Sequence, residues 1–104
     1  MADKPNNSPH TFFDGENFRP YTIIPGSLAK HGVAVDDVRA AMRDLLTYDQ
    51  VAVAPKMLLI GLDEKGRLLE MVGGIADDGV LVIWHAMKCR ASYIKLLPPW
   101  FRIQ

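Results

Sequence analysis

Four residues that can carry proton-transfer or phosphate chemistry follow one another near the C-terminus: His85, Lys88, Arg90 and Tyr93. Histidine, tyrosine and lysine can share proton transfers, and arginine can hold a phosphate with two hydrogen bonds. This set suits metal-independent RNA cleavage, which needs a base for the 2′-hydroxyl, an acid for the leaving oxygen and cations for the developing charge. A structural interpretation stays open, in which His85 is a half-buried sheet-end histidine and Lys88 and Arg90 are solvated at a helix start.

The charge distribution also singles out this part of the chain. Residues 1–79 contain all 12 acidic residues and 8 of the 12 Lys and Arg residues, whereas residues 80–104 contain four basic residues and no acid. A formally neutral protein therefore has a local basic region, and local field rather than total charge attracts a polyanion. Further candidates for RNA binding are Lys30, His31, Arg67 and Lys95.

Other classes of function find no support in the sequence. It has no phosphate-binding glycine loop, no nucleophile elbow and no HExxH motif, so we expect no cofactor. One Cys and three His residues make a zinc site improbable, so we expect no metal. No apolar run is long enough to cross a bilayer, and the single Cys89, a core residue rather than a nucleophile in our interpretation, fits a reducing cytoplasm.

The candidate residues must be positioned by a strand and the segment after it. The apolar run at residues 80–84 predicts a last strand that continues to Met87. In a regular strand, His85 would share a face with Leu81 and Ile83. Beyond it, Cys89, Tyr93 and Leu96 or Leu97 have the spacing of a short amphipathic helix that ends at Pro98 and Pro99.

The rest of the sequence predicts an α+β domain at residues 20–104, after a flexible tail at residues 1–19. We expect a short strand at 21–24, a helical turn at 27–32 and a helix with the apolar stripe Val35, Val38, Met42 and Leu45. Strands at about 50–54, 57–62, 68–72 and 80–87 follow, with turns at 63–66 and 76–79. Such short connections predict an antiparallel meander of three to four strands.

Several short motifs resemble the BrnT-like branch of the RelE-type toxins. They are KHGV at 30–33 followed by DDV at 36–38, LIG at 59–61 with GRLL at 66–69, and VIWHAMK at 82–88. The resemblance covers about residues 21–97. It implies a RelE-like fold and a cytoplasmic ribonuclease toxin of a type II toxin–antitoxin pair, which inhibits translation and is neutralised by an antitoxin, usually of the ribbon-helix-helix type.

Two departures from this family lead to a second hypothesis. Related sequences commonly have an arginine where this chain has Met87, and the chain is less basic than such toxins. The alternative is a degenerate, non-catalytic homologue that binds a protein partner through its sheet and its apolar C-terminal tail, as a homodimer or a heterocomplex.

Overall fold

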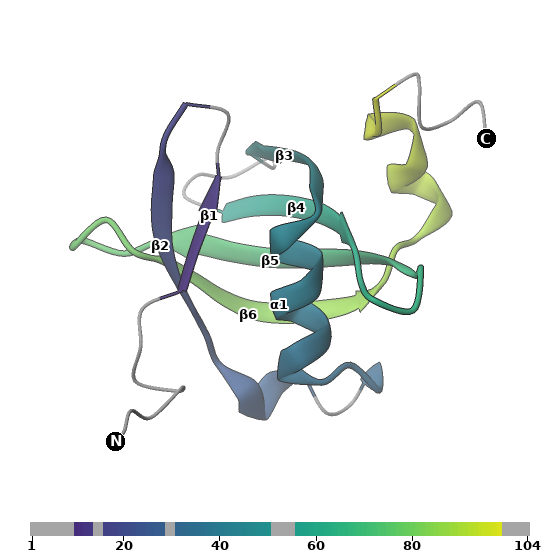
Figure 1. Ribbon diagram of the computed structural model, residues 1–104, viewed down its shortest axis with the longest axis horizontal. Helices are drawn as coiled ribbons and strands as arrows, with labels where there is room; N and C mark the ends of the chain where they lie inside the picture. Colours follow the sequence, from purple (N-terminus) through teal and green to yellow (C-terminus); the bar gives the residue numbers. More distant parts are fainter. Residues whose placement is uncertain (1–9, 14–15, 29–30, 51–55, 99–104) are drawn as a thin grey trace.

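The structure is a computed structural model that describes residues 10–13, 16–28, 31–50 and 56–98 (Figure 1). It is an α+β domain with one six-stranded sheet in the order β1-β2-β6-β5-β4-β3. The strands are β1 (His10–Phe13), β2 (Phe18–Ile23), β3 (Leu45–Gln50), β4 (Lys56–Leu62), β5 (Leu68–Ile75) and β6 (Leu81–Lys88). The helical elements are the 3-10 helix η2 (Pro25–Ser27), the α-helix α1 (Val35–Arg43) and the 3-10 helix η4 (Ala91–Leu96).

The predicted meander is confirmed. Strands β3, β4, β5 and β6 pair antiparallel in chain order. Gly66 and Gly79, in the two predicted turns, have positive φ angles of 81° and 85°. The strand expected at 50–54 begins earlier, at Leu45, and residues 51–55 lie outside the described part of the chain. Local turn chemistry was therefore sufficient to predict the antiparallel pairing of β4, β5 and β6.

The prediction of a loose tail at residues 1–19 is wrong where the structure describes that segment. β1 and β2 form an antiparallel hairpin, and β2 pairs in parallel with the first three residues of β6. Phe12 is buried in the core, whereas Phe13 and Phe18 are exposed. The sheet curls at this edge, so that the hairpin turns toward the side covered by α1 (Figure 1).

Helix α1 begins where Asp37 can satisfy a free backbone donor. The Asp37 carboxylate accepts a hydrogen bond from the Ala34 amide at 2.9 Å, and Asp36 adds a second negative charge in the first turn. The helix ends at Arg43, so Leu45 belongs to β3 and not to the helical stripe in which we had placed it. The turn expected from residue 27 starts two residues earlier, at Pro25.

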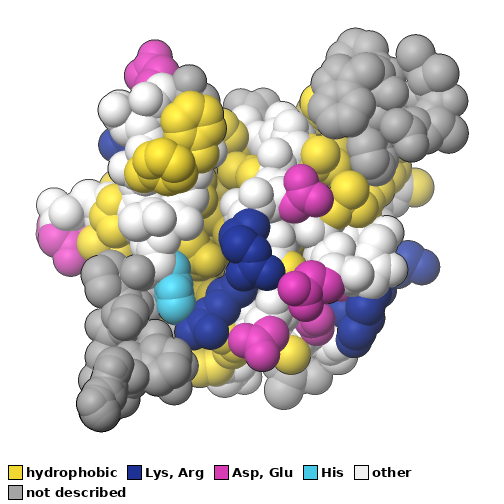
Figure 2. All heavy atoms as spheres, in the orientation of Figure 1, with side chains coloured by type: hydrophobic (Ala, Val, Ile, Leu, Met, Phe, Trp, Pro, Cys, Tyr) yellow, Lys and Arg dark blue, Asp and Glu magenta, His cyan; other side chains and the backbone are white. Residues whose placement is uncertain are grey.

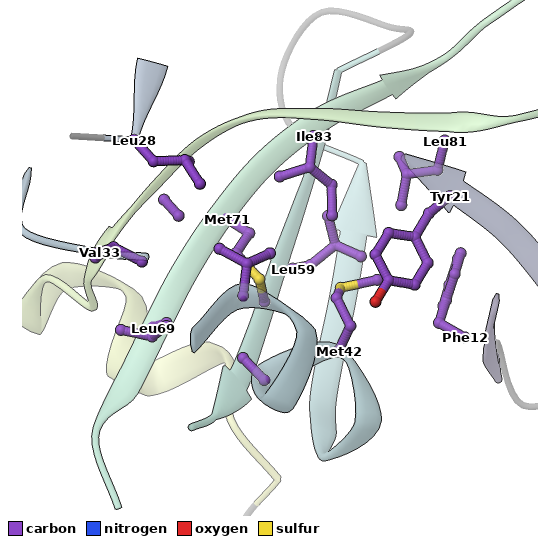
Figure 3. Packing of buried hydrophobic residues seen from close by; sticks show 13 residues of the cluster. Phe12, Tyr21, Leu28, Val33, Met42, Leu59, Leu69, Met71, Leu81 and Ile83 are labelled. Atoms are coloured by element: carbon purple, nitrogen blue, oxygen red, sulfur yellow. The ribbon is translucent and has the colours of Figure 1, made fainter. Parts of the chain in front are cut away.

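The main core lies between α1 and the sheet (Figure 3). Leu69 and Met71 of β5 point into it, together with Leu59 of β4 and Met42 of α1. The opposite face of the sheet carries a smaller cluster with Leu58, Ile60 and Leu97, covered by Cys89, Tyr93 and Ile94. Both faces of β5 are thus covered, which leaves no solvated face for a polar side chain.

In the segment after β6, the structure decides which of the two leucines that the sequence left open faces inward. Cys89, Tyr93 and Leu97 contact the smaller cluster, whereas Leu96 is exposed. The segment forms the 3-10 helix η4 and ends before Pro98. Within the described residues, no helix has the length and apolar character needed to span a membrane.

Candidate functional site

A buried glutamate, Glu70 in the middle of β5, is the centre of the polar site. Its neighbours Leu69 and Met71 point toward α1, so Glu70 points to the opposite face, and it has no solvent-exposed surface. A buried carboxylate must be paired to be tolerated. Arg90 supplies the pairing with three hydrogen bonds, from its backbone N and its Nε to Oε1, each at 3.0 Å, and from Nη2 to Oε2 at 2.8 Å.

These hydrogen bonds determine the charge state of Glu70. Burial alone would raise its pKa, but the hydrogen bonds from the Arg90 side chain and backbone, with the charges of Arg90 and His85, outweigh that effect and lower the pKa. The same contact with Glu70 raises the pKa of Arg90. The pair is therefore ionised at neutral pH and fixes the start of η4 against the sheet.

His85 approaches the same carboxylate from β6. Its Nε2 lies 3.6 Å from Oε2 of Glu70, and its ring meets the His31 ring edge to face, with 5.2 Å between centroids. His31 follows η2, in the connection to α1, and is solvent-exposed. Two imidazoles that are distant in sequence thus lie together at the end of the sheet.

Our prediction that His85 shares a face with Leu81 and Ile83 is wrong. The register between β5 and β6 shifts, so that Gly73 is opposite Ile83 but Val72 is opposite His85. A bulge of this kind gives one strand an extra residue and reverses the alternation beyond it. Because Val72 packs in the smaller cluster, His85 points to that side, away from α1.

Tyr93 completes the site from η4. Its hydroxyl lies 3.5 Å from Nη2 of Arg90, and the Arg90 guanidinium lies 5.1 Å from the ring centroid, in a cation–π contact. Arg90 is therefore held between a carboxylate and an aromatic ring, while 54% of its side-chain surface remains exposed.

The neighbouring thiol is not suited to nucleophilic chemistry. Burial, with a contribution from the negative charge of Glu70, raises the pKa of Cys89. The thiolate is the nucleophilic form of cysteine, and this environment disfavours it.

Two of the other predicted residues, Lys88 and Arg67, are directed elsewhere. Lys88 is exposed and opposite Leu69, so it is on the α1 side of the sheet, and its predicted catalytic role with His85 is not supported by the geometry. Arg67 pairs with Asp63 at 2.7 Å and Asp37 at 3.2 Å, which joins the β4–β5 turn to α1 and leaves little charge for RNA. Lys95 is exposed on η4, and Lys30 lies outside the described residues.

Sequence reasoning missed Glu70, although the sequence held a signal. The segment Leu68–Ile75 is apolar on both sides of this one acid. A strand covered on both faces cannot leave a carboxylate unpaired, so a cationic partner was to be expected. Among the described residues, no group of three or more His, Cys, Asp or Glu side chains is arranged to hold a metal ion.

Comparison with known proteins identified no relative of this chain. No family model matches the chain, and neither a curated protein nor a solved structure shows significant similarity to it.

Proposed function

We propose that this protein is a metal-independent ribonuclease, acting in the cytoplasm as the toxin of a toxin–antitoxin pair with a RelE-like, BrnT-like fold. The observation that carries the proposal is the meeting of the His31 and His85 rings beside the Glu70–Arg90 pair. The motif resemblance supplies the biological setting: RNA cleavage inhibits translation, and a ribbon-helix-helix antitoxin neutralises the toxin. The C-terminal tail, as a contact for the antitoxin or for a second copy, belongs to the same proposal.

The proposed reaction is transfer of the phosphate to the neighbouring 2′-oxygen. One imidazole takes the proton of the 2′-hydroxyl as this oxygen bonds to phosphorus. The bond to the 5′-oxygen breaks, and the second imidazole donates a proton to that oxygen. The products are a 2′,3′-cyclic phosphate and a free 5′-hydroxyl. The exposed part of Arg90 is available for the phosphate charge, and Tyr93 positions the guanidinium.

Replacing His85 with alanine is expected to reduce the rate of RNA cleavage by about 10²-fold or more, because one of two proton transfers loses its group. The measurement is cleavage of a labelled single-stranded RNA by purified protein in the presence of a chelator. His31→Ala should have an effect of similar size. Lys65→Ala is the matched control, since Lys65 is an exposed cation in the β4–β5 turn.

Lys88→Ala distinguishes the structural proposal from the simpler hypothesis of a basic cluster. The structure places Lys88 on the other side of the sheet, so this variant should keep its activity. The proposal is wrong if wild type and His85→Ala cleave RNA at the same rate and circular dichroism shows that both proteins are folded.

A second candidate function, a non-catalytic domain that binds a second copy of the chain, is favoured by an apolar surface at the β1–β2 hairpin. Phe13 and Phe18 are 53% and 73% exposed, and their rings lie 5.3 Å apart. Beside this hairpin, a cavity of about 600 Å³ is lined by Phe12, Met57 and Ile75, among others. Paired exposed aromatic side chains of this kind are typical of interaction surfaces.

If this surface mediates self-association, sedimentation velocity should show a concentration-dependent dimer for wild type and a monomer for Phe18→Ser. Leu96→Ser, at an exposed leucine on η4, is the control and should still dimerise. A wild-type protein that remains monomeric at several hundred micromolar would exclude the homodimer.

A further inference from the structure

A second polar cavity lies between the N-terminal hairpin and the start of α1, remote from the Glu70 site in the sequence. It has a volume of about 560 Å³ and is lined by His10, Thr22, Ile23, Pro25, Ala34, Val35, Asp36 and Arg39. Figure 2 shows this side of the molecule, where a histidine lies beside basic side chains with acidic side chains next to them. The volume falls within the range of small-molecule sites.

Arg39 is the principal charged group in this cavity, and its hydrogen bonding is incomplete. Its side chain is only 22% exposed, and its Nε is buried without a hydrogen-bond partner among the described residues. Buried donors are nearly always paired, so the unpaired Nε–H leaves the hydrogen bonding of Arg39 incomplete.

The contacts that Arg39 does make leave its charge largely uncompensated. Nη1 lies 3.5 Å from the carboxylate of Asp36, which is 87% exposed, and such a solvated pair is weak. Nη2 lies 3.1 Å from Nε2 of His10. Burial and the charge of Arg39 lower the pKa of His10, so the ring is neutral at pH 7 and its Nε2 accepts this hydrogen bond.

We propose that this cavity binds a small organic monocarboxylate, with its carboxylate on Arg39 and its apolar part against Ile23, Pro25 and Val35. The planar guanidinium matches a carboxylate with two parallel hydrogen bonds, and Thr22 also lines the cavity. Asp36 at the rim repels additional negative charge, which favours a single carboxylate over a phosphate dianion.

The test is a titration of the ¹⁵N-labelled full chain, followed by NMR, with sodium benzoate as the probe and neutral benzamide as its matched isostere. Saturable shifts are expected with benzoate for His10, Thr22 and the Nε–H of Arg39, and at least tenfold weaker binding is expected with benzamide. Equal binding of the two probes, or benzoate shifts that do not saturate, would overturn the proposal.

Two variants of α1 test the role of Arg39 itself. Arg39→Gln should weaken benzoate binding at least tenfold, whereas Arg43→Gln, one turn further along the helix, should bind as wild type does. Arg43 is a suitable control because it is exposed and pairs only weakly with exposed Glu64, at 3.4 Å. If Arg39→Gln does not fold, Arg39→Lys keeps the charge but loses the planar fork, and it should bind several-fold more weakly than wild type. Wild-type affinity in a folded Arg39 variant would contradict the site.

Discussion

Replacing Gly61 with alanine is expected to destabilise the fold by about 3 kcal/mol, which is large for the addition of one methyl group. A Cβ atom at Gly61 of β4 would collide with the backbone carbonyl of Ala41 in α1. Because the obstacle is backbone, no side-chain rotation relieves it, and the helix must move away from the sheet. The free energy of unfolding, measured by denaturant titration, should fall accordingly.

Gly26→Ala is the matched control for this prediction. No atom lies within 4 Å of a Cβ at Gly26, and its backbone does not have a positive φ angle. Its free energy of unfolding should stay within about 1 kcal/mol of wild type. If both alanine variants were equally stable, the close approach of α1 to β4 would be incorrect.

Glu70→Gln is expected to lower the free energy of unfolding by about 2–3 kcal/mol at pH 7. Removing one partner of a buried ion pair costs about 3–5 kcal/mol, but Arg90 is half exposed and water can replace part of what it loses. Glu64→Gln is the control, since the Glu64–Arg43 pair is exposed on both sides and should contribute under about 1 kcal/mol.

The same variant should change the pH dependence of stability. The pKa of Glu70 is lower in the folded protein than its ordinary value of 4.5, so the folded state binds its proton less readily than the unfolded state does. The stability from Glu70 is therefore present above about pH 4.5 and is lost as the pH falls through the folded-state pKa. Below about pH 4.5, the free energy of unfolding of Glu70→Gln should therefore fall less steeply with decreasing pH than that of wild type. An unchanged pH dependence in this range would show that Glu70 is not ionised in the folded protein.

The parts of the fold that the sequence predicted are those determined by local interactions. The turns ending at Gly66 and Gly79 join strands that are neighbours in the chain, so the meander follows from turn chemistry and alternation. Pairing between β2 and β6 joins residues 21–23 to residues 81–83, which are far apart in sequence. The sequence predicted a strand at 21–24 but gave no indication of its partner. A local pattern cannot reveal a partner strand that arrives from the other end of the chain.

The candidate site was predicted only in part, because only some of its residues are close together in the sequence. His85, Arg90 and Tyr93 are close in sequence, and the structure brings them together, with His31 beside them. The face that His85 occupies was predicted wrongly because a bulge, which depends on the pairing of two strands, changes which residues share a face with Leu81 and Ile83. Glu70 was missed because its importance comes from burial on both faces, which is a property of the assembled sheet.

The parallel pairing of Tyr21 with Leu81 has a consequence for how the chain folds. The four meander strands can assemble by closing short loops one after another, whereas β2 can join only after most of the chain has been brought back to it. The hairpin of β1 and β2 is therefore expected to dock last and, in the native protein, to detach first. The cavity at Arg39 is walled by that hairpin on one side and by α1 on the other. A ligand in this cavity would therefore bind only when the hairpin is docked, and it would stabilise the docked state against detachment of the hairpin.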